Sequence, residues 1–282
     1  MPNAAASRPP VVLVTGASSG IGKACAEHLA SRGFRVYGTS RHAPPAEAAA
    51  GGGSAGPAPR MIPLDVTSDQ SVEAAVGLVL AAEGRLDVVV NNAGFGIAGA
   101  VELTGMDEAH EQLETNFFGM MRVCRAVLPA MRRQGSGRIL NVSSIAGQIG
   151  IPFQALYSAS KFAIEGFTEA LRAEVAPFGI HVTLVEPGDF RTGFTAARRM
   201  TRQSADPAYA ASQARALAVM EHDETHGATP EAVARLVYRI ITMRSPGVRY
   251  AVGPASEKLA LLLKRLLPSN ALAWGIGKYY KV

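Results

Sequence analysis

The sequence predicts an α/β fold in which a doubly wound parallel sheet of about seven strands is covered by helices on both faces. Three observations lead to this prediction. Short runs rich in Val, Ile and Leu recur without strict apolar–polar alternation, which is typical of strands buried on both faces. Segments with helical spacing separate these runs, and a glycine-rich turn joins the first run to the first helix. Strands that alternate with helices form parallel sheets with right-handed crossovers.

The predicted elements alternate along the whole chain, so we expect residues 1–282 to form one domain. The predicted strands are residues 11–14, 35–39, 61–66, 86–92, 138–142, 181–186 and 248–252. The predicted helices are residues 21–31, 71–82, 107–133 and 157–176, and a last helix that starts at Thr229-Pro230-Glu231 and ends at Met243.

Four segments fall outside this repeat. Residues 1–10 are expected to be a tail, and the Ala-, Gly- and Pro-rich residues 43–60 a flexible surface loop. Residues 189–227 show no strand signal, and such a long late insertion predicts a substrate lid, with a plain solvated excursion as the alternative. Residues 254–282 form a C-terminal extension.

The extension combines apolar and basic residues. It carries Lys258, Lys264, Arg265, Lys278 and Lys281 against the single carboxylate of Glu257. We expect its apolar face to dock on the pocket or on a neighbouring subunit. A peripheral membrane helix, which makes at most surface contact with lipid, is the alternative.

Composition excludes several classes of protein. The chain is 48% hydrophobic and 18% charged, which is sufficient for a sizeable core and argues against disorder. Its net charge of +5 comes without a dense Lys/Arg run, so no nucleic-acid partner is expected. Cys25 and Cys124 are too few for a disulfide framework, and the His222–His226 pair lacks a third ligand, so no metal is expected. No signal peptide and no run of ~18 apolar residues is visible, which predicts a cytoplasmic protein.

A glycine-rich turn directly follows the first predicted strand and opens the first helix. Gly16 permits a tight turn, Gly20 lets the backbone approach a phosphate, and Gly22 lets the helix pack closely on the strand. Ser18, Ser19 and Ile21 lie in the same turn. The free N–H groups of the helix N-terminus favour a pyrophosphate. This context indicates a Rossmann-type dinucleotide-binding domain.

Tyr157 and Lys161 stand four residues apart on a predicted helix and therefore project from the same face. A phenol has a pKa near ~10, too high for a base at neutral pH. A lysine ammonium beside it is expected to favour the phenolate by lowering that pKa. Taken alone, such a pair is usually no more than two surface neighbours.

Several motifs together, in this order, resemble the short-chain dehydrogenase/reductase family over about residues 11 to 253, and especially its hydroxysteroid and retinol dehydrogenases. Ser144 precedes Tyr157 by thirteen residues, as the family pattern requires. The matching residues are Thr15, Gly16, Gly20 and Gly22; Asn91, Asn92, Ala93 and Gly94; Asn116; Ser143 and Ser144; Tyr157 and Lys161; and Pro187, Gly188 and Thr192.

The resemblance implies an alcohol–carbonyl oxidoreductase and a role for each of four catalytic residues. Tyr157 is implied as the general acid in reduction and the base in oxidation, and Lys161 as the residue that binds the nicotinamide ribose. Ser144 is implied to hydrogen-bond the substrate oxygen, and Asn116 to hold a water that links Lys161 to solvent. A homodimer or homotetramer is also implied.

The end of the second predicted strand bears on the choice of cofactor. The family's acidic position is occupied by Ser40, and Arg41 follows it. A small polar residue and a guanidinium suit a 2′-phosphate, which predicts NADP(H). Ser19 stands where the family sometimes has a basic residue, so NAD(H) remains possible. The other expected cofactor contacts are Asp65, Val66, Asn92, Ala93, Gly94, Pro187, Gly188, Phe190 and Thr192.

The expected substrate pocket is largely apolar and predicts a lipophilic alcohol or carbonyl compound of the steroid, retinoid or long-chain type. Its expected lining residues are Phe95, Ile97, Ile145, Gln154, Phe190 and Phe194. Three alternatives remain open. One is an NAD-preferring alcohol dehydrogenase, and another is a non-catalytic NADP(H)-binding sensor. The third is a ketoacyl reductase whose carrier-bound substrate docks on Arg198, Arg199 and Arg202.

Overall fold

A computed structural model gives the structure of residues 8–44, 58–203 and 206–282. Most of the predicted tail, and residues 45–57 of the predicted surface loop, lie outside the described residues.

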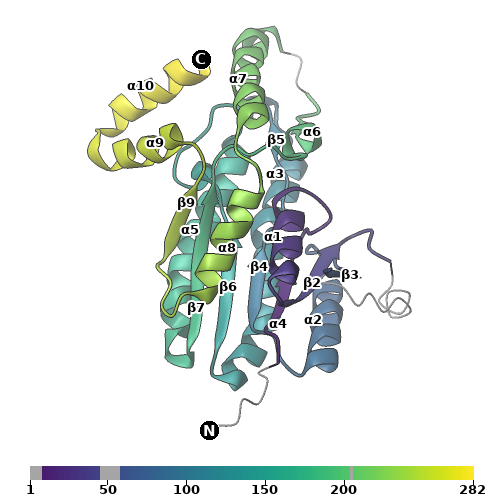
Figure 1. The fold of residues 1–282 in the computed structure, drawn as a ribbon. Helices are drawn as coiled ribbons and strands as arrows, with labels where there is room; N and C mark the ends of the chain where they lie inside the picture. Colours follow the sequence, from purple (N-terminus) through teal and green to yellow (C-terminus); the bar gives the residue numbers. More distant parts are fainter. Residues whose placement is uncertain (1–7, 45–57, 204–205) are drawn as a thin grey trace.

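Within the described part of the chain, seven parallel strands form the central sheet in the order β3-β2-β1-β4-β6-β7-β9 (Figure 1). Sheet order and sequence order diverge at β1 and β4, which creates the switch point where doubly wound sheets bind ligands. The predicted fold class is therefore confirmed. The strands are β1 Val11–Val14, β2 Arg35–Ser40, β3 Arg60–Pro63, β4 Val88–Asn91, β6 Gly137–Val142, β7 Ile180–Pro187 and β9 Arg249–Val252.

Strand β3 ends three residues before the predicted end at position 66. The Asp65 carboxylate accepts a hydrogen bond from the Thr67 N–H at 3.0 Å and turns the chain toward the next helix. Ser68 caps that helix by accepting from the Ser71 N–H. These local hydrogen bonds end the strand at Pro63, although the apolar run in the sequence continues to Val66.

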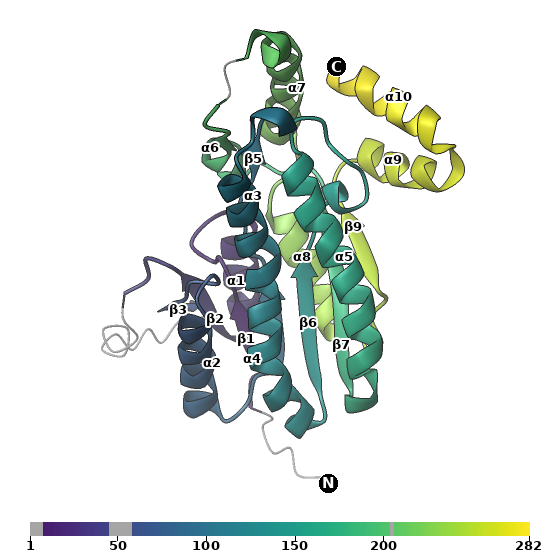
Figure 2. The same cartoon turned by 180° about the vertical axis from the view of Figure 1, so that it is seen from behind.

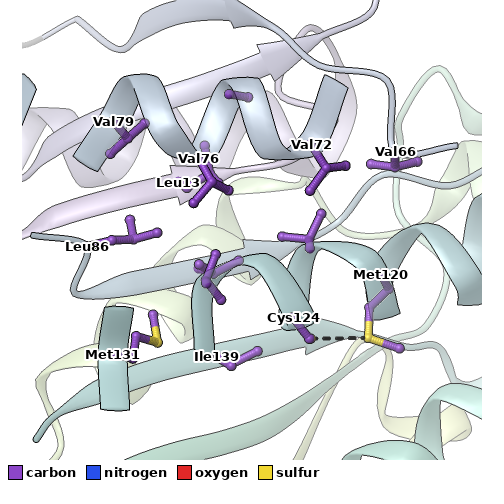
Figure 3. Close-up of a cluster of buried hydrophobic side chains, with 14 of the residues drawn as sticks. Leu13, Val66, Val72, Val76, Val79, Leu86, Met120, Cys124, Met131 and Ile139 are labelled. Carbon is purple, nitrogen blue, oxygen red and sulfur yellow. Dashed lines mark hydrogen bonds between the residues drawn. The ribbon is translucent and has the colours of Figure 1, made fainter. Parts of the chain in front are cut away.

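Helices cover both faces of the sheet (Figures 1 and 2). On one face lie α1 Gly20–Ser31 and α8 Glu231–Thr242, and on the other α2 Asp69–Glu83, α4 Gly119–Gln134 and α5 Ala155–Val175. In β1, Leu13 packs into the core beneath α2 and α4, whereas Val12 and Val14 pack into the opposite core. Figure 3 shows Leu13 among the valines of α2. A strand with a hydrophobic core on each side needs apolar residues on both of its faces, which explains the continuous Val-rich runs.

The two cysteines lie in these cores, Cys25 in α1 and Cys124 in α4. Burial raises the pKa of each thiol to about 12, so both act as packing residues. Figure 3 shows Cys124 beside Met120. Among the described residues, no three His, Cys, Asp or Glu side chains gather in a way that would hold a metal ion.

The single helix predicted for residues 107–133 is wrong in detail. The structure has α3 Met106–Leu113, a π-helical turn at Glu114–Phe118, and then α4. Asn116 lies in the π turn, and such turns frequently occur at functional sites. The apolar spacing on either side of the turn is helical, so the pattern did not reveal it.

Residues 189–227 were expected to lack a strand, and this prediction is wrong. They contain α6 Phe194–Ala197, β8 Arg199–Met200 and α7 Pro207–His226, and β8 pairs in parallel with β5 Ile97–Ala98. A two-residue strand is too short to show periodicity. The chain ends in α9 Ala255–Leu266 and α10 Ser269–Tyr280. Throughout the part of the chain that the structure describes, no helix has both the length and the apolar character needed to cross a bilayer.

Candidate active site

A cavity of about 880 Å³ lies at the carboxyl ends of the strands, and it reaches from the turn after β1 to α9 and α10. Most of the residues predicted to bind cofactor or substrate oxygen lie on its wall. Gly22 and Asn116 are absent from the wall and lie behind it. The wall residues among those predictions are Gly16, Ser18, Ser19, Gly20, Ile21, Ser40, Arg41, Asp65, Val66, Asn92, Ala93, Gly94, Ser144, Tyr157, Lys161, Pro187, Gly188, Phe190 and Thr192.

The glycine turn forms a cradle beside the N-terminus of α1. Gly16 and Gly20 have φ angles of +65° and +54°, which L side chains rarely adopt. A Cβ on Gly20 would lie 3.4 Å from the Cβ of Thr192, so the loop after β7 closes the cradle from the other side. A Cβ on Gly22 would collide with the Gly16 carbonyl. Only a bare backbone fits here, and it leaves the helix N–H groups open to a phosphate.

Thr15 connects this cradle to the turn after β4, a role that the sequence reasoning missed. Its Oγ1 accepts hydrogen bonds from the N–H groups of Asn92 at 2.9 Å and Ala93 at 3.0 Å. The Asn92 side chain donates to the Thr15 carbonyl at 3.0 Å. The only signal for this role was the position of Thr15 just before the first glycine.

The end of β2 forms the far part of the cavity wall. Arg41 is exposed and makes no hydrogen bond or ion pair within the described residues. The buried Thr39 hydroxyl beside it also has no partner there. Burial works against the charge of Asp65, yet hydrogen bonds from Thr67 and the charges of Arg41 and Arg122 hold its pKa below the usual range. The cradle, the orphaned hydroxyl and the unpaired guanidinium together fit a nicotinamide dinucleotide.

The catalytic candidates converge where β6 meets α5. Tyr157 lies in the first turn of α5, and Lys161 follows one turn later on the same face. Ser144, two residues after the end of β6, hydrogen-bonds with the phenol of the half-buried Tyr157. The Lys161 ammonium donates to the Val142 carbonyl at 2.9 Å and lies 5.6 Å from the centre of the Tyr157 ring.

Burial dominates the electrostatics of this group. It raises the pKa of Tyr157 to about 12, and the Ser144 hydrogen bond offsets this only in part. Burial likewise lowers the pKa of Lys161 to about 8, against the opposing charge of Glu165. The expectation of a lowered Tyr157 pKa is therefore wrong for the protein alone, because desolvation of the phenolate outweighs the Ser144 hydrogen bond. At neutral pH Tyr157 is a proton donor.

Asn116 connects the loop after β4 to the catalytic helix. Its Nδ2 donates to the Phe95 carbonyl at 3.0 Å and to Ser160 Oγ at 3.1 Å, and its Oδ1 accepts from the Phe95 N–H at 3.0 Å. Ser160 in turn donates to the Tyr157 carbonyl at 2.7 Å. Both side-chain N–H groups of Asn116 are used, so its side chain positions Phe95 and α5.

Of the predicted substrate residues, Phe95, Ile145, Gln154, Phe190 and Phe194 lie on the cavity wall. Ile97 does not, and this prediction is wrong, because β5 pairs with β8 and buries that side chain. The C-terminal helices supply an apolar chamber wall, which agrees with the expectation that the apolar face of the extension docks on the pocket, although its individual lining residues were not predicted. The chamber residues are Ala260, Leu263, Leu267, Ala271, Leu272 and Ile276.

Two carboxyl groups meet at the junction of the loop after β7 with α9. The Asp189 N–H donates to Glu257 Oε1 at 2.9 Å, and the two side chains are hydrogen-bonded to each other. Burial first, and then the neighbouring Glu257, raise the pKa of Asp189 to about 8. Burial raises the pKa of Glu257 as well.

The basic residues predicted to dock a carrier are each paired. Arg198 contacts Glu224, Arg199 contacts Glu111, and Arg202 contacts Asp107. These three arginines thus form no free basic patch, which removes the feature that favoured a carrier-bound substrate.

A parallel sheet with a phosphate cradle at its switch point and a Ser–Tyr–Lys group beside it defines an NAD(P)-dependent oxidoreductase that acts on CH–OH groups. The model of the family described as short chain dehydrogenase matches residues 10–203, and the chain belongs to this family.

Two relatives differ in how much of the chain they share. A 3-ketodihydrosphingosine reductase of Bacteroides thetaiotaomicron is 44% identical over 278 residues, which cover 98% of this chain and 99% of that protein. Human 17-beta-hydroxysteroid dehydrogenase type 1 is 43% identical over 191 residues, which cover 65% of this chain and 58% of that one. The first similarity covers nearly the whole chain, including the region of the C-terminal helices, whereas the second covers about two thirds of it.

Solved structures have the same fold. A short-chain dehydrogenase from Streptomyces avermitilis superposes with a TM-score of 0.81 at 35% identity and covers 98% of this chain and 97% of its own. An alcohol dehydrogenase from Thermococcus sibiricus, complexed with 5-hydroxy-NADP, gives a TM-score of 0.71 at 25% identity, with 87% and 97% coverage.

Proposed function

We propose that this protein uses NADPH to reduce the keto group of a long-chain lipophilic substrate, and that 3-ketodihydrosphingosine represents the substrate class. One observation carries the proposal: the cavity continues from Tyr157 into an apolar chamber walled by α9 and α10. A long alkyl chain matches such a wall, because its burial is favourable without any polar partner. A relative that matches 98% of this chain, and so includes the region of these helices, is named for the reduction of a lipid ketone.

Polar groups near Tyr157 suit the head of such a substrate. Gln154 is 4% exposed, lies on the cavity wall, and its Nε2 has no partner within the described residues. It therefore offers a donor to a carbonyl or hydroxyl oxygen. 3-Ketodihydrosphingosine carries a hydroxyl and an amino group beside its ketone. The Asp189–Glu257 carboxyl pair on the cavity wall suits the ammonium form of that amine.

The cofactor residues divide along the cavity. The cradle of Gly16 and Gly20 holds the pyrophosphate, and Ser40 and Arg41 take the 2′-phosphate. Asp65 and Val66 flank the adenine. At the other end, the last residue of β7 and residues of the following loop hold the nicotinamide; they are Pro187, Gly188, Phe190 and Thr192.

The residues of the chain then handle the proton. When bound, the nicotinamide supplies the hydride that adds to the carbonyl carbon. Tyr157, protonated at neutral pH, gives its proton to the carbonyl oxygen as the negative charge develops. Ser144 stabilises that charge through its hydroxyl. The Lys161 ammonium, one turn away, stabilises the resulting phenolate and returns a proton to it.

The test is NADPH consumption with a ketone panel, run on the wild type and on Tyr157→Phe. The panel contains 3-ketodihydrosphingosine, a steroid ketone, retinal and a short water-soluble ketone. We expect the lipid ketone to be reduced fastest. The phenylalanine variant is expected to lose about 10²- to 10⁴-fold in rate while it still binds NADPH, seen by nucleotide fluorescence. Tight NADPH binding without turnover of any lipophilic carbonyl would overturn the proposal.

A further inference from the structure

The last two helices present an apolar surface that the rest of the molecule leaves uncovered. Leu259, Leu262 and Leu266 of α9 are spaced by three and four residues, share one helix face and are exposed, Leu266 to 69%. Within α9, which the structure describes in full, Leu261 alone is buried. On α10, Trp274 is 68% exposed. We call Leu259, Leu262, Leu266 and Trp274 the outer face.

The outer face continues into the mouth of the substrate cavity. Leu263 and Leu267 lie next to it along the chain, and both are exposed yet also line the cavity. Figures 1 and 2 show α9 and α10 set off from the sheet at one side of the molecule, beyond the end of β9. An apolar path thus runs from the outside of α9 to the chamber.

The basic side chains around the outer face favour a negatively charged partner. Lys258, Arg265 and Lys278 are exposed on the same two helices, and Lys281 is exposed just after α10. The Lys278 ammonium lies 6.0 Å from the centre of the Trp274 ring. The only carboxylate side chain of the extension, Glu257, contacts Asp189 in the interior. A second copy packed face to face would bring equal cations together, whereas an anionic lipid surface complements both the cations and the apolar side chains.

We propose that α9 and α10 dock on an anionic lipid bilayer. The outer face inserts at the boundary between headgroups and acyl chains, and the four cations contact the lipid phosphates. Leu263 and Leu267 then guide a lipophilic molecule between bilayer and cavity. The docking is argued from the exposed surface of α9 and α10 alone. Only the movement of a lipophilic molecule past Leu263 and Leu267 rests on the proposed function.

The test is co-sedimentation of the full chain with vesicles of phosphatidylcholine alone or mixed equally with phosphatidylglycerol. The wild type is expected to bind the mixed vesicles at least tenfold more strongly, and less so at high salt. A double variant, Leu262→Asp with Leu266→Asp, is expected to lose at least tenfold of this binding. Neither leucine lines the cavity. Val248→Asp is the matched control, because Val248 is exposed but precedes β9 at the opposite end of that strand.

Each outcome separates the alternatives. Wild-type protein that stays in solution with mixed vesicles, or a double variant that binds as the wild type does, overturns docking. Sedimentation velocity detects a subunit interface: an oligomer that dissociates in the double variant, with vesicle binding unchanged, assigns the outer face to a second copy.

Reduction rates complete the test. The double variant is expected to slow only for a vesicle-embedded ketone and to keep the wild-type rate on a water-soluble one. Docking without reduction of either ketone would refute the proposed function and leave the docking surface intact.

Discussion

The Glu257 carboxylate fills the space directly beside the Cα of Gly188, so any side chain at position 188 would overlap it. Gly188 directly follows β7 among the predicted nicotinamide contacts, and Glu257 lies in the first turn of the helix that walls the apolar chamber. The Gly188 N–H also donates to the Val252 carbonyl at 2.9 Å, just before that helix. The contact between Gly188 and Glu257 therefore joins the cofactor end of the cavity to its substrate end.

Gly188→Ala is expected to force Glu257 away and to shift α9. Overpacking of this kind costs about 1–3 kcal/mol, measured as the free energy of unfolding in urea. The KM for the lipid ketone is expected to rise more than the Kd for NADPH. Gly193→Ala in the same loop is the control, since a Cβ there meets no atom within 4 Å. Equal behaviour of the two variants would show that the contact does not hold α9.

Asp189→Asn is expected to flatten the dependence of stability on pH. The Asp189 pKa rises to about 8 in the folded protein from an ordinary value of 3.8. Its unfolded form therefore binds fewer protons between these pH values, and stability falls as the pH rises toward 8. The asparagine variant lacks this loss and is expected to be the more stable protein at pH 8. Urea unfolding of both proteins from pH 5 to pH 8 measures the difference in slope, and parallel curves would contradict the assignment.

Arg41→Asp is expected to reverse the nucleotide preference. The guanidinium is unpaired within the described residues, and a charge-assisted hydrogen bond to a phosphate contributes about 1.5–3 kcal/mol. We expect kcat/KM for NADPH to fall roughly 10- to 100-fold relative to NADH. Arg133→Asp, an exposed change at the end of α4, controls for net charge. An unchanged ratio would leave the NAD-preferring alternative in place.

Arg198→Met is expected to destabilise the segment between β7 and α8. The Arg198 side chain is 3% exposed and pairs with Glu224, which also accepts from the Thr195 hydroxyl. Removing one partner leaves a buried charge and costs about 3–5 kcal/mol. The double change with Glu224→Gln is expected to recover much of this loss. Limited proteolysis of α6 and α7, together with urea unfolding, tests both variants, and additive losses would argue against the pair.

Sequence-local features were predictable, and tertiary ones were not. The strands, the glycine cradle and the spacing of Ser144, Tyr157 and Lys161 are encoded in short stretches, so the fold and most of the cavity wall followed from them. Ile97 was misplaced because its burial depends on pairing with Arg199, about a hundred residues away. The Tyr157 pKa was misjudged because desolvation depends on the completed fold and not on the neighbour four residues along.

The lining residues of the C-terminal wall could not be predicted for a related reason. Leucines spaced along α9 predict a helix with an apolar face, but not which of its sides meets a cavity. Here one side closes the chamber through Leu263, and the other remains outside at Leu262. The expectation that the extension docks on the pocket held for the first side only.

The order of these parts along the chain has a consequence for descent and engineering. The candidate reacting groups lie between Gly16 and Thr192, inside the matched family region of residues 10–203, whereas the chamber wall comes from residues after 255. The reacting groups and one wall of the substrate chamber are thus encoded in separate, consecutive stretches of the gene. Recombination at the Gly253–Pro254 junction can graft a foreign tail onto an unchanged reaction centre, so lineages of such enzymes can acquire new substrates by exchanging their last thirty codons or so.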